Sequence, residues 1–335
     1  TLFPYTTLFR SVKGFAKGQL TETSVPKFSI AIASDNASFQ YPNLPKAIKN
    51  IHIDTKIVNE TGDMNDTYVA IDKLSFAIDQ DVFNAKATLK NIAENTQVNA
   101  ALKGIINLTN FSKAYPIQLK KPLSGILKAD VTTAFDMASV EKKEYARIKN
   151  AGTIDLSGFQ YTDASGKTMD IRKVAVVFNT SRVNLKQFEA KTGKSDIAAS
   201  GVLENFYGFL FRKENLQGNF NLTSNQLAVN DFMTPTNTST NESKKAAAPL
   251  KIPAFLDCSL TAKATTVLYD NLTLKNCTGK LILNDQKATL EKVKTEVFQG
   301  QIELNGAVNT KEKTPKFNMN LGLNHVDIAQ SFTQL

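Results

Sequence analysis

The stretch Cys258–Asn284, CSLTAKATTVLYDNLTLKNCTGKLILN, alternates apolar and polar residues on both sides of an Asp-Asn pair. Leu260, Ala262 and Ala264 are separated by threonine and lysine, a period of two that is typical of a strand with one buried and one solvent-facing side. The polar pair Asp270-Asn271 stands between two apolar runs, where it predicts a tight hairpin turn. The stretch therefore predicts two antiparallel strands.

The two cysteines of the chain lie in this hairpin. A turn at residues 270–271 places Cys258 opposite a position near Leu283, and Cys277 opposite a position near Ala264. Several residues then separate the two thiols along the strands, which is too far for a disulfide bridge. We therefore expect two free thiols, and these do not indicate the redox compartment.

The same alternation recurs along the chain. Leu74, Phe76 and Ile78 alternate with small residues, and Phe317–Asn324 alternates without a break. The runs are rich in threonine, valine, isoleucine and phenylalanine, which strands favour, and turn-forming residues separate them. The sequence predicts a mainly β fold of antiparallel strands.

Helical signal is scarce. The clearest candidate is Met137–Lys149, where Val140, Tyr145 and Ile148 give a thin apolar stripe. A weaker candidate is the short segment Ala329–Phe332. We expect one or two short helices beside the strands.

Composition excludes several classes of protein. The 335 residues are 42% hydrophobic and 21% charged, which argues against disorder and against a bundle embedded in a membrane. No apolar run approaches the roughly 20 residues of a membrane-spanning helix. The net charge is +9, but the lysines are scattered and form no stripe for nucleic acid. We expect no nucleic-acid partner.

Residues for catalysis or metal binding are few. The chain has two histidines, and alternation aims His52 at the solvent side of its strand because it stands between Ile51 and Ile53. Zinc requires more histidine or cysteine ligands at usable spacing, and no glycine-rich phosphate loop or nucleophile motif occurs. We therefore expect a protein that is not an enzyme and uses no metal or cofactor.

An internal repeat is the most informative feature. A strand, a turn and further strands follow in similar order from Phe28, from Gly152 and from Cys258, and tyrosines fall at matching places. A shorter similar segment follows each repeat. In it, a strand ends at Asn or Thr and a short apolar stretch comes next. The matching tyrosines are Tyr41, Tyr161 and Tyr269, and the similar segments are INLTNFSKAY at Ile106, FNLTSNQLAV at Phe220 and LGLNHVDIAQ at Leu321.

The repeats suggest a division of the chain. Residues 1–11, TLFPYTTLFRS, resemble an in-frame translation of a sequencing adapter, so we expect the natural sequence to begin near Val12, in mid-protein. The segment 234–250 is rich in Thr, Asn, Ser and Pro and predicts a disordered linker. The expected parts are the adapter (1–11), a first β repeat (12–110), a connector with a short helix (111–151), a second β repeat (152–233), the linker (234–250) and a third, truncated β repeat (251–335).

The strands of each repeat have one apolar face that must be covered. The few expected helices are too small to cover it. Three solutions remain: a second sheet packed on the first, closure into a barrel, or an apolar ligand that is not protein.

A family resemblance bears on this choice. The third repeat contains VFQGQIELNGAV (297–308), followed by FNMNLGLNHVDIAQSF (317–332). This resembles the recurring pattern of the AsmA-like family, the relatives of TamB, in which a Gly-led strand pair precedes an amphipathic strand and a Val-Asp-Ile tail. The resemblance covers most of the chain after Val12 and rests on strand patterns with few diagnostic residues.

The resemblance implies an elongated, twisted antiparallel sheet, built from repeats, that forms an open apolar groove. It implies a periplasmic protein, anchored in the bacterial inner membrane by an N-terminal segment missing here. The implied function is to bind phospholipid or another acyl lipid and conduct it between inner and outer membrane in support of outer-membrane biogenesis. An outer-membrane protein partner is also implied.

Alternation alone nominates the residues that would line such a groove. The same residues fit the dry core between two packed sheets equally well. The candidates are Ile51, Ile53, Leu74, Phe76 and Ile78 in the first repeat; Ile154, Leu156, Val176, Phe178 and Val183 in the second; and Leu281, Leu283, Ile302, Leu304, Met319 and Leu321 in the third.

Two other functions compete with lipid binding. A structural or adhesive array of β-sandwiches on the cell surface predicts closed sheets with dry cores and no lipid. A β-solenoid enzyme acting on carbohydrate predicts clustered carboxylates and aromatic platforms, and the absence of tryptophan from the sequence counts against it.

Overall fold

A computed structural model gives the fold of the chain. It describes residues 5–7, 10–22, 24–116, 123–144, 147–162, 166, 168–179, 182–232, 252–312 and 314–330. Strands account for most of these residues, so the predicted mainly β class is confirmed. The expected linker, 234–250, lies outside the described residues.

The chain forms two compact units. The first comprises residues 1–159 with 175–183, and the second comprises residues 160–174 with 184–335.

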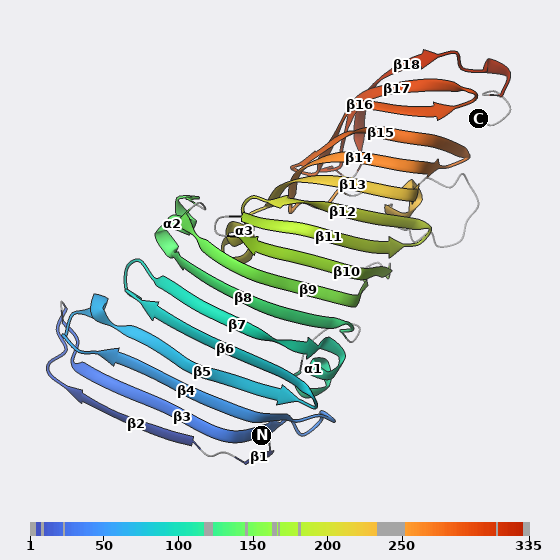
Figure 1. The fold of residues 1–335 in the computed structure, drawn as a ribbon. Coiled ribbons are helices and arrows are strands. Elements are labelled where there is room, and N and C mark those ends of the chain that lie inside the picture. Colours follow the sequence, from blue (N-terminus) through green and yellow to red (C-terminus); the bar gives the residue numbers. More distant parts are fainter. Residues whose placement is uncertain are drawn as a thin grey trace. The chain divides into compact units, whose positions relative to one another are not determined.

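The first unit is an open antiparallel sheet in which consecutive strands from β2 to β9 are neighbours (Figure 1). The short strand β1 pairs with the far end of β3. The elements are β1 (Tyr5–Thr7), β2 (Arg10–Lys17), β3 (Lys27–Gln40), β4 (Ile48–Asn59), η1 (Met64–Asp66), β5 (Tyr68–Ile78), β6 (Asp81–Lys90), β7 (Gln97–Asn107), α1 (Leu108–Ala114), β8 (Ile126–Asp136), α2 (Met137–Glu141) and β9 (Lys149–Thr162).

The second unit is also a sheet of consecutive strands. From β12 to β18 consecutive strands are again neighbours, antiparallel except for the parallel pair β13–β14. Strands β10 (Thr168–Asn179) and β11 (Arg182–Thr192) are divided between the units. The others are β12 (Ser195–Leu203), α3 (Phe206–Arg212), β13 (Leu216–Ala228), η3 (Val229–Phe232), β14 (Leu256–Tyr269), β15 (Leu272–Asn284), β16 (Lys287–Val297), β17 (Gly300–Asn309) and β18 (Lys316–Asn324).

The predicted repeat is confirmed as a block of five strands. The blocks are β3–β7, β9–β13 and β14–β18, and each opens on a strand of 14 residues. Tyr41 directly follows β3, whereas Tyr161 and Tyr269 lie at the ends of β9 and β14. A short helical segment follows each block, as α1, as η3 and as residues 328–330. Strands β1, β2 and β8 lie outside these blocks.

The short segments that follow each repeat align differently in the structure than in the sequence. Asn107-Leu108-Thr109 begins helix α1, with the Asn107 side chain capping its first turn. The identical triplet Asn221-Leu222-Thr223 lies in the middle of strand β13. The shared feature is therefore a strand that runs into a short helix, and the triplet itself does not fix where the helix begins.

The helix predicted over Met137–Lys149 is wrong in length. Helix α2 ends at Glu141, and Lys143 follows in the left-handed region with a φ of 59°. Residues 328–330 are helical, in agreement with the weaker candidate. Helices α1 and α3 were not predicted, so the described chain has more short helical segments than the one or two expected.

The hairpin at the centre of the sequence argument is confirmed. Tyr269 pairs with Leu272 across the two-residue turn, and Asp270, the first central residue, adopts a positive φ of 51°, as primed hairpin turns require at that position. Cys258 pairs with Leu283, and Cys277 with Ala264, as predicted from the turn position. Both cysteines are free thiols.

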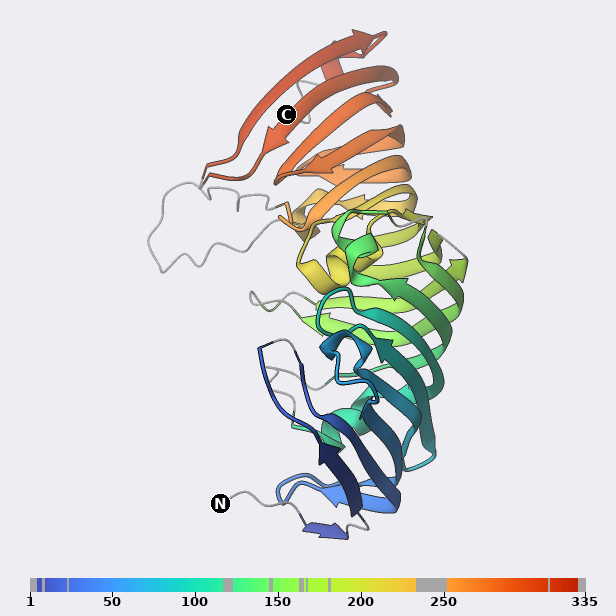
Figure 2. The ribbon, with the colours of Figure 1, turned by 90° about the vertical axis from the view of Figure 1, so that its left-hand side faces the viewer.

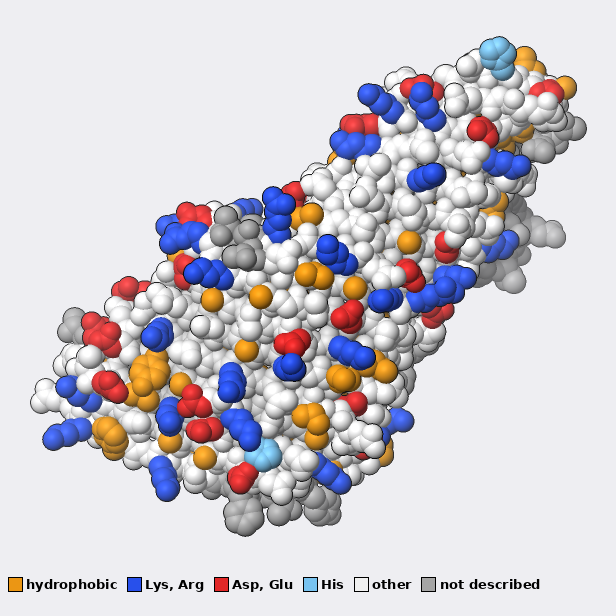
Figure 3. Space-filling view, viewed as in Figure 1, with side chains coloured by type: hydrophobic (Ala, Val, Ile, Leu, Met, Phe, Trp, Pro, Cys, Tyr) orange, Lys and Arg blue, Asp and Glu red, His pale blue; other side chains and the backbone are white. Residues whose placement is uncertain are grey.

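The strands of the first unit curve, and α1 and α2 lie on the inner side of the curve (Figure 2). Figures 1 and 3 view the outer side. Within each unit, the described strands contact their sheet neighbours and the short helices, and the described residues of the unit form no second sheet.

Candidate functional site: the apolar face of each sheet

Cross-strand pairs show that one face of the first unit is apolar from strand to strand. Residues paired across antiparallel strands point to the same side of the sheet. One row passes through the centre of the face, and its members are half-buried or buried except Leu102, which is exposed at 36%. The row runs Ile53, Leu74, Ala85, Leu102, Val131.

A second row on this face combines aromatic rings with small residues. Phe76 and Phe83 are paired, with ring centroids 5.4 Å apart. Phe83 pairs with Gly104, and a Cβ at that glycine would meet the Phe83 ring at 3.0 Å. The row continues through Ala129 to Ile154. Aromatic rings lying over glycine keep the face apolar where side chains are missing.

The opposite face of the first unit is polar and faces water. Figure 3 shows basic and acidic side chains interspersed over it. Cross-strand ion pairs lie here, with N–O distances of 2.7 Å between Lys103 and Asp130 and 3.6 Å between Lys56 and Asp72. The pKa of Lys103 is raised by its hydrogen bond to the Asp130 carboxylate and by the charge of that group. We call the two sides the apolar face and the polar face.

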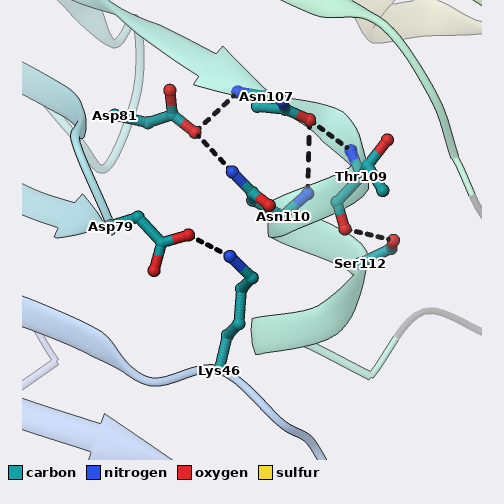
Figure 4. A network of polar contacts seen from close by, with 7 residues as sticks. All are labelled: Lys46, Asp79, Asp81, Asn107, Thr109, Asn110 and Ser112. Carbon is teal, nitrogen blue, oxygen red and sulfur yellow. Dashed lines mark hydrogen bonds and ion pairs between the residues drawn. The ribbon is translucent and has the colours of Figure 1, made fainter.

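Helix α1 borders the apolar face at one end of the strands. The Asn107 side chain accepts hydrogen bonds from the backbone N–H of Thr109 (3.0 Å) and of Asn110 (3.4 Å). Asp81 accepts from the Asn107 backbone N–H at 3.1 Å and from the Asn110 amide at 3.3 Å (Figure 4). The capping residue therefore ties the helix to the β5–β6 turn.

A second contact holds the same helix from the neighbouring loop. Lys46 forms an ion pair with Asp79, and its backbone N–H donates to the carbonyl of Lys113 at 3.2 Å (Figure 4). Ile78, at the end of β5, is buried with 1% exposure, and β5 contacts α1. Ile78 therefore packs beneath this end of the face and is not open to a ligand.

Helix α2 lies at the opposite end of the strands. The Asp136 carboxylate accepts from the Ser139 hydroxyl (2.6 Å), from the Ser139 backbone N–H (2.9 Å) and from the Asn95 amide (3.2 Å). These hydrogen bonds, the Ser139 hydroxyl first, hold the pKa of Asp136 below its ordinary value against the effect of burial. Val140 and Ile148, which follow this cap in sequence, are buried.

The second unit has an apolar face of the same design. Leu304 pairs with Leu321 and Ile302 with Leu323, and the exposed fraction rises to 58% and 62% for the two leucines of strand β18. Strand β18 has no strand on its other side in the described residues. A row across five neighbouring strand pairs runs Phe220, Leu260, Leu281, Leu290, Gly306, Met319.

Both cysteines belong to the apolar face of the second unit, through their partners Leu283 and Ala264. Burial raises the pKa of both thiols, so they stay protonated and act as small apolar side chains. Neither thiol is placed as a nucleophile.

The structure brings most of the predicted groove residues together. Thirteen of the predicted positions lie on an apolar face. They are placed there by their cross-strand partners or by alternation with residues so placed, and one of them, Ile78, is covered. Val176 on β10 is half-buried, whereas Phe178 and Val183 are buried at 4% exposure, as for packing residues. The thirteen are Ile51, Ile53, Leu74, Phe76, Ile78, Ile154, Leu156, Leu281, Leu283, Ile302, Leu304, Met319 and Leu321.

Several residues of the apolar faces were missed from the sequence. Leu102 and Val131 occupy the centre of the first face, and Phe220, Leu260 and Leu290 lie on the second. Their strands alternate as clearly as those that were chosen. Alternation along every strand would have found them, but it could not say which residues of separate strands form one row.

His52 lies on the polar face, as alternation predicted. Together with Asp35 and Ser75 it has the residue types of a catalytic triad. Its Nε2 is 2.9 Å from the Asp35 carboxylate, and its Nδ1 is 3.4 Å from the Ser75 hydroxyl. The same Nδ1 is 2.8 Å from the carbonyl oxygen of Asn50, to which it must donate a proton. That nitrogen cannot also accept the proton of Ser75, so the arrangement does not activate the serine.

The described residues contain no group of three or more His, Cys, Asp or Glu side chains that could hold a metal ion. Among the helices of the described chain, none has the length and apolar character needed to cross a membrane.

Comparison of the chain with protein-family models, with curated proteins and with solved structures finds no match.

Proposed function

We propose that this chain binds phospholipid or another acyl lipid along the apolar faces of its sheets. The observation that carries the proposal is a continuous apolar surface in each unit with only short helices at the strand ends. A sandwich needs a second sheet over this surface, and the described residues of each unit form only one sheet. An uncovered apolar surface of this extent in a soluble sheet is typical of a binding site.

Acyl chains match this surface chemically. Each methylene moved from water onto an apolar surface contributes roughly 0.8 kcal/mol, so a whole acyl chain binds without any specific polar contact. The rows of Leu, Ile, Phe and Ala supply such a lining. A site of this kind requires no catalytic or metal-binding motif.

We extend the proposal, on the resemblance to the AsmA-like family, to a place in the cell. The protein would be anchored in the bacterial inner membrane and lie in the periplasm. There it would conduct phospholipid between the two membranes and support outer-membrane biogenesis, with an outer-membrane protein as its partner. The protein would act without catalysis.

Lipid mass spectrometry tests the binding step. The chain is purified from bacteria without detergent, and its lipid content is compared between two variants on β7. Leu102→Asp changes the apolar face, whereas Ile105→Asp changes a residue of similar exposure, 43%, on the polar face.

We expect near-stoichiometric phospholipid with the unchanged chain and with Ile105→Asp, and several-fold less with Leu102→Asp. A folded chain that carries no lipid, or an equal loss in both variants, would overturn the proposal. Circular dichroism of each variant confirms that the sheet has formed.

A further inference from the structure

A cavity of about 700 Å³ lies at the ends of strands β6 to β9. Most of its strand residues belong to the polar face, since Lys90 pairs with Gln97, Gln97 with Asp136, and Ala134 with Lys149, while the pair Val98 and Phe135 of the apolar face also lines it. The segment that follows β8 closes the cavity with Ser139, Lys142, Glu144 and Arg147.

The charges around this cavity are not balanced. Four basic side chains line it (Lys90, Lys142, Arg147 and Lys149) against two carboxylates, an excess of two positive charges. Figure 3 shows basic side chains gathered around α2 at this end of the polar face.

Both carboxylates are already engaged. Asp136 accepts the hydrogen bonds of Ser139 and Asn95, and Glu144 forms an ion pair with Arg147 at 2.8 Å. The three lysines have no ion-pair partner in the part of the chain that the structure describes. Two lysines elsewhere on this face do have such partners: Lys103 pairs with Asp130 and Lys56 with Asp72.

We propose that this cavity binds a phosphate-bearing ligand. Three ammonium groups with nine N–H donors surround it, and the side-chain amides of Gln97 and Asn99 line the same wall. A volume of about 700 Å³ exceeds the needs of a bare ion and suits a small organic phosphate or a lipid headgroup.

This site does not depend on lipid binding at the apolar face, because most of its strand residues belong to the polar face and it uses charge. A free organic phosphate and the headgroup of an anionic phospholipid share the chemistry that it recognises. The two sources can be separated by experiment.

The test uses the full chain and a pair of matched double variants. Lys90→Ala with Lys142→Ala removes two cavity lysines. Lys86→Ala with Lys128→Ala removes two exposed lysines of the polar face, on β6 and β8, that do not line the cavity. Calorimetric titration with glycerol 3-phosphate, and flotation with phosphatidic acid or phosphatidylcholine vesicles, measure binding at fixed ionic strength.

We expect the cavity variant to lose at least about tenfold in affinity and the control variant to keep it. Binding of glycerol 3-phosphate identifies a soluble ligand, and binding of phosphatidic acid vesicles alone identifies a headgroup; either supports the proposal. An equal loss in both variants would show a general charge effect and overturn it. Binding of neither probe by the unchanged chain would overturn it as well.

Discussion

At the scale of single residues, alternation in sequence predicts which side of a strand a side chain occupies. Leu74, Phe76 and Ile154 lie on the apolar face as predicted, and His52 lies on the polar face. Alternation does not predict how deeply a side chain is buried. Ile78 fits the pattern, yet it is covered because a helix contacts the end of its strand.

Gly152 is a residue whose identity the backbone requires. Its φ is +116°, and a Cβ at this position would overlap the carbonyl oxygen of Asp130 on the neighbouring strand. We expect Gly152→Ala to lower the free energy of unfolding by roughly 1–3 kcal/mol, because L residues rarely adopt this conformation. Urea unfolding measures the loss.

Gly322→Ala is the matched control, since the nearest atom to a Cβ there is the Glu303 carbonyl oxygen at 3.8 Å. We expect its stability to change by less than about 0.5 kcal/mol. Equal effects of the two substitutions would contradict the strain at Gly152.

At the scale of elements, strands were predictable and short helices were not. A period of two is readable over the 9 to 14 residues of the strands from β3 to β18, except where a glycine or a bulge interrupts it. Helix α1 has seven residues, too few for a helical period, and depends on the cap of Asn107. The same letters Asn-Leu-Thr form a strand in β13, where neighbouring strands supply the hydrogen bonds.

The parallel pair β13–β14 also escaped prediction. β13 ends at Ala228 and β14 begins at Leu256, so the intervening chain must return to the end of the sheet where β13 began. Parallel neighbours require such a long connection. The segment was identified from composition as a linker, but composition does not show what a linker must span.

Removing the cap of α1 should loosen this helix locally. Asn107→Ala deletes the acceptor for Thr109 and Asn110, which costs about 1 kcal/mol. We expect faster amide hydrogen exchange over residues 108–114, measured by mass spectrometry, with exchange in β5 and β6 less affected. Lys113→Ala, an exposed position of the same helix, is the control. Unchanged exchange in Asn107→Ala would contradict the capping role.

The cap of α2 should make stability depend on pH. Hydrogen bonds from Ser139 lower the pKa of Asp136 in the folded chain. The carboxylate therefore contributes stability that is fully present above its unfolded pKa, about 3.9, and that is lost as pH falls through the lower folded value. Urea unfolding at about pH 6 and about pH 3 should show a smaller loss for Asp136→Asn than for the unchanged chain. An identical loss in both would exclude a role for this group.

At the scale of the whole molecule, the sequence predicts amphipathic strands and their repetition but not what covers the apolar side. A sandwich core and an open lipid surface require the same alternation, because both bury one face of each strand. The choice depends on whether a second layer exists. In each unit of the structure the apolar face is bordered by helices at the strand ends and has no second sheet over it.

Photo-crosslinking tests this claim most directly. The full chain is loaded with a phospholipid that carries a diazirine near the end of one acyl chain, irradiated, and digested for mass spectrometry. Strand β7 provides the internal comparison, because Val98, Ala100 and Leu102 lie on the apolar face and Asn99, Ala101 and Lys103 on the polar face. We predict adducts on the first set and not on the second. Adducts spread equally over both sets, or none on β7 or on the apolar face of the second unit, would contradict an open lipid-binding face.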